Sequence, residues 1–255
     1  MRAKCPECRA YTAVALGPEY ECHACGRTFA AGLVRVPRAW GRGGESMAEA
    51  AWLPLPYPEV AVIEEDSLAA QSLALALELP ERPLVLGGCC CSHVGAVEAL
   101  TARHGRVAVV WLDAHGDLNT VESSPSRNEW GMPLRMLLDS GAVQADDVAL
   151  VGARNLDPPE VEFIAANGVG TGPEAVASAL EGAGGAYVAV DFDALTEDEV
   201  AAFMPEPDGL LLEEAEQVLV DVRGRTDVLG SGLSGLVPDE RNLEPARRLT
   251  AALGL

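Results

Sequence analysis

The chain has 255 residues, of which 49% are hydrophobic, 22% charged and 5% aromatic. This composition is typical of a globular protein, and the length suffices for one large core with a small appendage. The formal net charge of −21 disfavours binding to nucleic acid or anionic membranes and favours cationic ligands, metal ions included. Acidity of this degree also keeps a protein soluble without any such ligand.

The expected compartment determines how the cysteines are interpreted. The first residues, MRAKCPECRA, contain no apolar segment of the kind that a secretion signal requires, and no stretch reaches the length of a membrane span. We therefore expect a cytoplasmic protein, in which cysteines bind metal or react more often than they form disulfides. The seven cysteines form two groups, four before residue 26 and three in succession at 89–91.

The first predicted unit, residues 1–32, carries two Cys-x-x-Cys pairs. Each pair places two thiolates on one side of a tight turn, and two pairs complete a tetrahedral zinc site. A unit this small buries too little surface to be stable alone, so the metal would supply its folding energy. We predict a zinc-ribbon-like segment with one structural zinc, held by Cys5, Cys8, Cys22 and Cys25.

Residues 33–255 are predicted to form one larger α/β domain. Almost wholly apolar runs, typical of strands buried on both faces, occupy residues 83–88, 106–117, 146–154 and 186–195. Helical segments are predicted at 94–104, 133–140, 159–167, 173–181, 208–220 and 243–252. Residues 36–60, rich in Pro, Gly and Trp, are expected to be loop and linker. This alternation predicts a three-layer α/β/α domain with a mainly parallel sheet.

Polar residues follow the ends of all four predicted strands. GGCCCSH follows the first, DAHGD closes the second, RNLDPPE follows the third and DFD closes the fourth. Because the carboxyl ends of parallel strands meet at one edge of a sheet, we expect these residues to form a single site.

The two aspartate-rich motifs predict a metal centre. Asp113, His115 and Asp117 alternate in position, so on an extended backbone they share one face, and Asp191 and Asp193 do the same. Alone, an Asp-x-Asp at a strand end is often a helix cap, and a lone histidine is usually a hydrogen-bonded core residue. Together they suit two divalent ions, of which Mn²⁺ fits a carboxylate-rich set. Two such ions can hold a hydroxide between them and polarise the group that it attacks.

In order and spacing, VLGGCCCSHVGA, DAHGDLNT, VGARNLDPPE and VAVDFDAL resemble the motifs of the arginase/agmatinase (ureohydrolase) family. The resemblance covers roughly residues 80–250. It implies a three-layer α/β fold, a binuclear Mn²⁺ centre and hydrolysis of a C–N bond in a guanidino or related group. It also implies a homo-oligomer, trimeric or hexameric, that acts on a small molecule. Five of the family's six metal ligands match Asp113, His115, Asp117, Asp191 and Asp193.

The resemblance also implies roles for individual residues. Asp113 and Asp191 would hold the metal-bridging hydroxide, and Asp117 would orient it and take up its proton, so these three are the expected catalytic residues. Glu214 would receive the guanidinium group. The expected substrate-binding residues are Asn119, Ser126, Asn128, Asp157, Glu160 and Glu214. Without the resemblance, the last four are just as typical of turns and helix ends.

Two positions depart from the family pattern. Cys90 stands where the family has its sixth ligand, a histidine, and a thiolate there would move the preference toward Zn²⁺ or Fe²⁺. The sequence leaves open whether Cys90 or His93 is the ligand, or whether Cys89 to Cys91 are simply small buried residues. Trp130 stands where the family has a histidine that shuttles protons to the leaving amine, which an indole is unable to do.

The sequence supports two functional hypotheses. The first is a binuclear-metal hydrolase of guanidine, amidine or ureido C–N bonds in a small amino-acid-like substrate. The second is a catalytically altered or non-catalytic arginase-like protein that senses a ligand or binds a partner, and Cys90 and Trp130 favour it. Nucleic-acid binding through the zinc ribbon is disfavoured by the charge.

Overall fold

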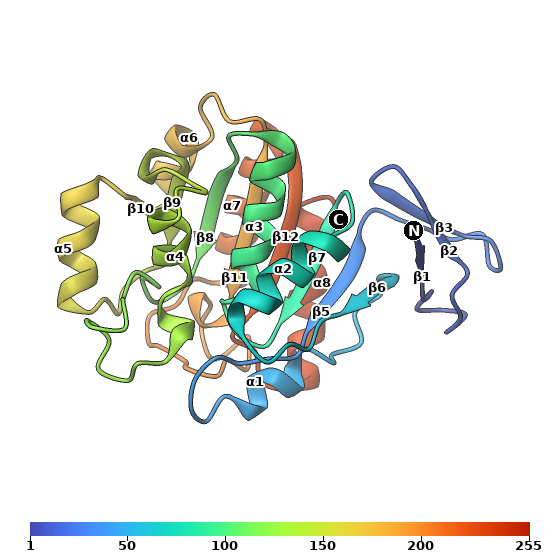
Figure 1. Ribbon diagram of the computed structural model, residues 1–255, viewed down its shortest axis with the longest axis horizontal. Helices are drawn as coiled ribbons and strands as arrows, with labels where there is room; N and C mark the ends of the chain where they lie inside the picture. Colours follow the sequence, from blue (N-terminus) through green and yellow to red (C-terminus); the bar gives the residue numbers. More distant parts are fainter.

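The main sheet has eight strands, all paired in parallel, in a computed structural model that describes residues 1–255 (Figure 1). From one edge to the other its order is β10 (Gly170–Thr171), β9 (Val148–Val151), β8 (Ala108–Leu112), β11 (Ala186–Asp191), β12 (Val228–Ser234), β7 (Pro83–Gly87), β5 (Gly32–Val36) and β6 (Glu59–Val62). The mainly parallel α/β fold that the sequence predicts is therefore confirmed.

The central strands are buried along their whole length. Every residue of β7, β8, β9 and β11 is buried, as expected for apolar strands that are covered on both faces. Because side chains alternate along a strand, Val110 and Leu112 pack into one core while Val109 and Trp111 pack into another. The sheet thus separates two hydrophobic cores, one under each layer of helices.

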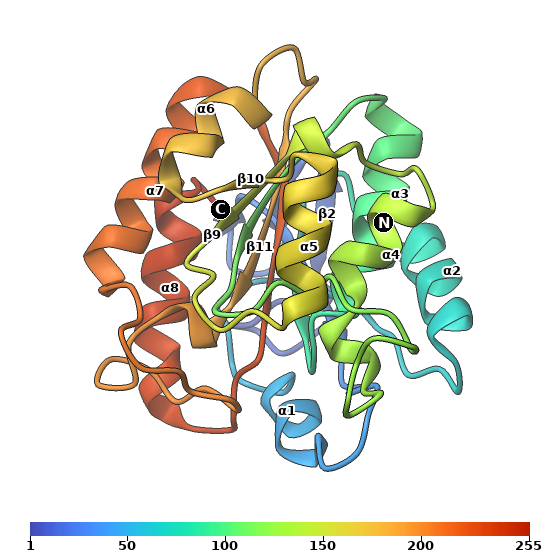
Figure 2. The ribbon, with the colours of Figure 1, turned by 90° about the vertical axis from the view of Figure 1, so that its left-hand side faces the viewer.

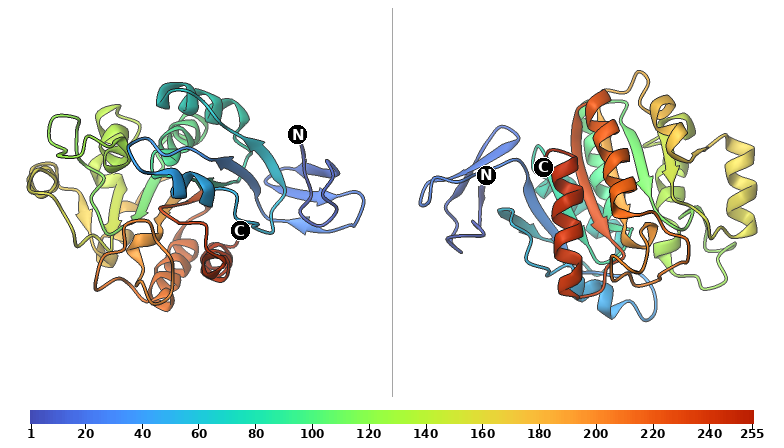
Figure 3. Two further views of the ribbon diagram at one scale, coloured as in Figure 1. Left: turned by 90° about the horizontal axis from the view of Figure 1, so that it is seen from below. Right: turned by 180° about the vertical axis from the view of Figure 1, so that it is seen from behind.

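Helices cover both faces of the sheet (Figure 2). One layer holds α2 (Leu68–Glu78), α3 (Ser92–His104), α4 (Pro133–Asp139) and, beyond the β10 edge, α5 (Pro158–Asn167). The other holds α6 (Val176–Ala179), α7 (Leu212–Arg225) and α8 (Leu243–Ala252), of which α7 and α8 lie side by side in Figure 3. A short helix, α1 (Glu45–Ala50), follows β5. No helix is both long and apolar enough to pass through a bilayer.

A separate antiparallel sheet forms the N-terminal part of the chain. It consists of β1 (Arg2–Ala3), β2 (Ala13–Leu16), β3 (Glu19–Cys22) and β4 (Thr28–Phe29), and it lies beyond the edge of the main sheet (Figure 3). Its own core contains Cys5, Tyr20 and Cys22. The backbones of Lys4 and Glu59 exchange two hydrogen bonds of 2.8 and 2.9 Å, which attach this sheet to edge strand β6.

Several elements differ from the sequence-based expectations. The helix expected at 208–220 begins later, at Leu212, because Leu210 pairs with Leu195 and holds the preceding loop extended. The helix expected at 173–181 is a 3-10 turn, Pro173–Ala175, followed by the single turn of α6. The stretch 36–60 is not wholly loop, since it contains α1 and the start of β6. Strand β12, VLGSGLS, was not expected because its small residues interrupt the apolar run.

The burial of the central sheet predicts the cost of truncating its side chains. Leu84 of β7 is fully buried in the core under α7 and α8, so Leu84→Ala should lower the free energy of unfolding by about 2–5 kcal/mol. Leu77→Ala, on the exposed face of α2, makes the same chemical change outside the core and should cost under about 0.5 kcal/mol. Urea unfolding of both variants measures the difference, and equal losses would contradict the packing described.

Candidate metal centre and active site

The polar residues that follow the strands converge at the carboxyl ends of β7, β8, β11 and β12. Asp113 follows β8 directly, Cys90 lies three residues after β7, and Asp191 and Ser234 are the last residues of β11 and β12. Cys90, Asp113 and Asp191 border a cavity of about 260 Å³, which all six predicted metal ligands line. The expectation of one site at this edge of the sheet therefore agrees with the geometry.

The carboxylate of Asp113 lies between two groups of candidate ligands. Its Oδ1 is 3.5 Å from His115 Nδ1, which is 3.0 Å from Asp193 Oδ2. Its Oδ2 is 3.9 Å from Cys90 Sγ on the other side. Ligand atoms of Asp113, His115 and Asp193 lie within 4.8 Å of one another, and so do those of Cys90, Asp113 and Asp117. Two ligand groups that share one carboxylate fit a pair of neighbouring ions.

Asp191 belongs to the Cys90 side of this arrangement. Its Oδ2 is 2.8 Å from Cys90 Sγ, and its Oδ1 accepts a hydrogen bond of 2.9 Å from the backbone N–H of Asp193. Gly235, with φ of +69°, follows β12 and lies against the Asp191 carboxylate, which a Cβ at this position would overlap. A glycine is thus required for Asp191 to hold its place.

His93 lies behind the cavity. It is fully buried, and its two ring nitrogens are each 3.0 Å from a hydroxyl, Nδ1 from that of Tyr187 and Nε2 from that of Ser234. Ser234 Oγ is in turn 3.2 Å from Cys90 Sγ. Burial lowers the pKa of His93 to about 3, so the ring is neutral. Of the two residues considered for the sixth ligand, the structure brings Cys90 to the cavity and leaves His93 to support it through Ser234.

The electrostatics of the centre suit divalent cations. Burial raises the pKa of Asp191 to about 7 and that of Asp193 to about 6, with the neighbouring carboxylates adding to both. Burial and then the charge of Asp113 raise the pKa of Asp117 well above its usual range. Burial opposes the charged form of His115, but Asp113 and Asp193 outweigh it and raise its pKa to about 12. Such crowding of acids is unfavourable unless cations offset it.

Asp117 gives a second sign that the centre holds a ligand. Its Oδ2 is buried and has no hydrogen-bond partner, which is rare for a carboxylate oxygen. Its backbone has φ of +53°, a conformation that few residues other than glycine adopt. Strain and an unpaired buried oxygen at one residue are typical of a functional position. The carboxylate-rich donor set therefore fits two divalent ions.

Four of the six predicted substrate-binding residues line the cavity: Asn119, Ser126, Asp157 and Glu160. Asn119 Nδ2 donates a hydrogen bond of 2.9 Å to Asp157 Oδ2. Glu160 accepts hydrogen bonds from the backbone N–H groups of Leu118 and Asp157, so it also caps α5. Asn128 does not line the cavity, and its Oδ1 instead accepts from the backbone N–H of Arg42 at 3.0 Å.

Glu214 is the main correction to the predicted site. It is exposed in the first turn of α7, where its carboxylate accepts a hydrogen bond of 2.9 Å from the backbone N–H of Leu211, and it does not line the cavity. The loop before α7 is longer than predicted, and its acid nearest the centre is Glu206. Glu206 Oε1 is 3.5 Å from His115 Nε2 and accepts a hydrogen bond of 2.7 Å from Asn155 Nδ2.

Arg154 holds this loop against the residues that follow β11. Its guanidinium donates hydrogen bonds of 2.7–3.4 Å to five backbone carbonyls, those of Gly152, Asp193, Ala194, Glu206 and Pro207. The planar fork of an arginine can join several segments in this way because its donors have fixed directions. The sequence did not indicate a role for Arg154 or Glu206. Their contacts depend on the course of the loop before α7, and the sequence did not predict the length of that loop.

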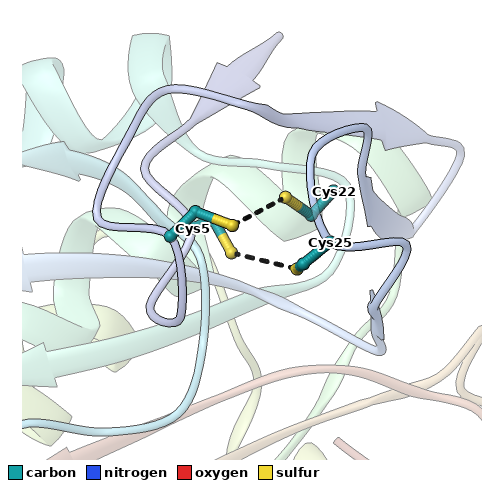
Figure 4. A group of neighbouring side chains, drawn as sticks. Cys5, Cys22 and Cys25 are labelled. Carbon is teal, nitrogen blue, oxygen red and sulfur yellow. Dashed lines mark hydrogen bonds between the residues drawn. The ribbon is translucent and has the colours of Figure 1, made fainter.

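The four N-terminal cysteines form a second, separate cluster. All four sulfurs lie within 4.8 Å of one another, with 3.9 Å between Cys5 and Cys25 and 3.8 Å between Cys8 and Cys22. Figure 4 shows Cys5, Cys22 and Cys25 directed toward one another from two turns of the small sheet. All seven cysteines of the chain are free thiols. Four converging thiols suit one tetrahedral zinc ion.

Comparison with known proteins extends this description. The family model "Arginase family" matches residues 53–253. An arginase of Staphylococcus aureus (strain COL) is 37% identical over 113 residues, which are 40% of this chain and only 37% of that protein. The native arginase structure from Bacillus caldovelox superimposes with a TM-score of 0.73 at 23% identity, covering 87% of this chain and 97% of that one. Proclavaminate amidino hydrolase of Streptomyces clavuligerus gives 0.68 at 20% identity, covering 87% and 89%.

An eight-stranded parallel sheet with carboxylates gathered at its carboxyl edge defines an arginase-like α/β protein. The family match extends over most of the main domain. The chain belongs to the arginase family.

The glycine beside Asp191 predicts a specific defect in metal binding. Gly235→Ala should displace the Asp191 carboxylate and weaken Mn²⁺ binding on the order of 10-fold or more, as changes next to metal ligands do. Gly131→Ala is the matched control, because Gly131 also lines the cavity and a Cβ there meets open space. Mn²⁺ titration followed by calorimetry measures both, and unchanged binding in Gly235→Ala would contradict the proposed role of Asp191.

The cysteine cluster predicts a zinc ion independent of the main site. After exposure to zinc and gel filtration, Cys22→Ser should retain one zinc ion fewer than the unmodified chain, because only three thiolates remain in its cluster. Cys90→Ser should keep this zinc, since Cys90 lies in the other cluster. Elemental analysis gives the stoichiometry, and equal zinc contents in Cys22→Ser and the unmodified chain would exclude a four-cysteine site.

Proposed function

We propose that the protein is a binuclear-metal hydrolase that cleaves a C–N bond of a guanidine, amidine or ureido group in a small, cationic, amino-acid-like substrate. The observation that carries this proposal is the position of Asp113 between two ligand groups at the floor of an acidic cavity. Relatives named arginase and proclavaminate amidino hydrolase support the reaction class.

The donor set determines which ions would be held. Asp113, His115 and Asp193 would hold one ion, and Cys90, Asp113, Asp117 and Asp191 the other. The carboxylates favour Mn²⁺, while the thiol of Cys90 shifts its side toward Zn²⁺ or Fe²⁺. When bound, the two ions would activate water and polarise the planar carbon that it attacks.

The residues of the chain supply positioning and proton transfer. Asp113 and Asp191 would hold the ions, and Asp117 Oδ2, which has no hydrogen-bond partner within the protein, would accept a proton from water. Asp157 and Glu160 also line the cavity and would complement a cationic substrate. Ser126 and Asn119 offer neutral polar contacts for its remaining groups.

A second candidate is a protein that binds such a ligand without turnover. Trp130 favours it, because this residue lines the cavity and an indole is unable to transfer protons. The same hypothesis gives the zinc-ribbon-like segment the role of contacting a partner.

Under either proposal we retain three expectations. The protein is a homo-oligomer, a trimer or hexamer, it is cytoplasmic, and residues 1–32 and 33–255 form separate units.

A panel of guanidino, amidino and ureido compounds, assayed with Mn²⁺ for release of urea or ammonia, tests the reaction. Asp191→Asn should lower activity on the order of 10³-fold, because it weakens the support of the ion on the Cys90 side. Asp146→Asn is the matched control, because Asp146 is an exposed carboxylate at the amino end of β9, away from the cavity. Release of product by the unmodified protein but not by Asp191→Asn is the expected result. Calorimetric binding without turnover by the unmodified protein would favour the second candidate.

A further inference from the structure

One wall of the cavity is apolar. Met47, Trp130, Phe203 and Met204 line it, and they come from α1, from the 3-10 turn Glu129–Gly131 and from the loop between β11 and α7. The rings of Trp130 and Phe203 meet edge to face, with centroids 5.9 Å apart and planes at 79°. Both pack against the small cluster of Met47, Cys89 and Cys91. This wall is therefore part of the packed structure.

The Trp130 ring is held in one place by a loop that precedes α1. A Cβ at Gly41 or Gly44 would overlap or crowd the indole, so these glycines leave the space that the ring fills. The backbone N–H of Glu129 donates a hydrogen bond of 2.8 Å to the carbonyl of Trp40, and the backbone N–H of Arg42 donates one of 3.0 Å to Asn128 Oδ1. The residues just before Trp130 are thus attached to the loop that encloses it.

The rest of the cavity is acidic. Asp157 and Glu160 line it together with the four aspartates of the metal centre, and no lysine or arginine is among its lining residues. Two divalent ions would offset the four aspartates and leave the other two acids to attract a cation. A cavity lined in this way favours a ligand that is positively charged and carries an apolar group.

The face of Trp130 is not used by a cation of the protein itself. Arg35 lies over Trp52 and Arg38 over Trp40, at 5.9 and 5.4 Å from the ring centroids, whereas no such contact involves Trp130. An indole that faces an acidic cavity attracts a planar cation and also offers a large apolar surface. Because it transfers no proton, it acts through binding.

We propose that the substrate is a guanidinium or amidinium with a planar apolar substituent, and that Trp130 and Phe203 select this substituent. The proposal rests on the proposed function for the nature of the cationic group, and it assigns to the two aromatic residues a role in specificity. It also accounts for a tryptophan where a proton-transferring residue would otherwise be expected. A simple alkyl guanidine would leave the aromatic wall uncovered.

Binding of phenylguanidine and methylguanidine to the full-length, Mn²⁺-loaded protein tests this proposal. Isothermal titration calorimetry should give a dissociation constant on the order of 10-fold lower for phenylguanidine, from the apolar area that the ring covers. Trp130→Ala should reduce this ratio to about 3-fold or less, while Trp130→Phe keeps an aromatic ring and should retain most of it. Trp52→Ala, a half-exposed tryptophan that does not line the cavity, should leave the ratio unchanged.

The outcomes separate this proposal from the proposed function. The proposal would be overturned by equal affinities for the two compounds, by no binding of either, or by an unchanged ratio in a folded Trp130→Ala. Circular dichroism and thermal melting establish whether the variant is folded. If Trp130→Ala does not fold, Trp130→Phe and Phe203→Leu replace it, and the ratio should fall in the second variant only. Preferential binding without hydrolysis of any compound in the panel would overturn the hydrolase and leave the aromatic specificity standing. Hydrolysis of a compound in the panel without preferential binding of phenylguanidine would support the hydrolase and overturn the aromatic specificity.

Discussion

The candidate site depends on the burial of one carboxylate, that of Asp113, between two sets of ligands. Its two oxygens face different neighbours, and each is fixed by the protein. Oδ1 accepts a hydrogen bond of 2.7 Å from the backbone N–H of His115, and Oδ2 accepts one of 3.1 Å from Trp111 Nε1. The indole of Trp111 is itself fully buried in a core under the helices. The packing of the sheet therefore sets the orientation of the carboxylate that both ligand groups share.

The parallel sheet makes this concentration of acids feasible. Four strand ends bring side chains distant in the sequence to one edge. The backbone N–H groups of Ala114, His115 and Asp193 donate hydrogen bonds to carboxylate oxygens there. The crowding still raises the pKa of each aspartate, first through burial and then through neighbouring charge. An arrangement that opposes its own ionisation is typical of a functional centre, because structural cores avoid unpaired buried acids.

The two sides of the cavity divide its chemistry. Carboxylates and His115 gather at the strand ends, and the apolar wall comes from α1, the 3-10 turn Glu129–Gly131 and the loop between β11 and α7. Arg154 connects the two sides, since it bonds the carbonyl of Asp193 and the loop that carries Glu206. The acidic centre and the apolar wall are thus connected by hydrogen bonds, although their residues are far apart in the chain.

The sequence by itself determined the elements whose signals are local. Apolar runs located four of the eight strands of the main sheet, paired cysteines located the N-terminal cluster, and the aspartate-rich motifs located acids of the cavity. The extended backbone expected for residues 113–117 is not found, because β8 ends at Leu112 and Asp117 has φ of +53°. Only the tertiary structure decided which residues meet across the fold. It brought Cys90 rather than His93 to the cavity, left Glu214 as a helix cap, and added Glu206, Ser234 and Gly235. The reason is physical: periodicity and propensity act over a few residues, whereas loop length and the course of strands such as β12 depend on packing between distant segments.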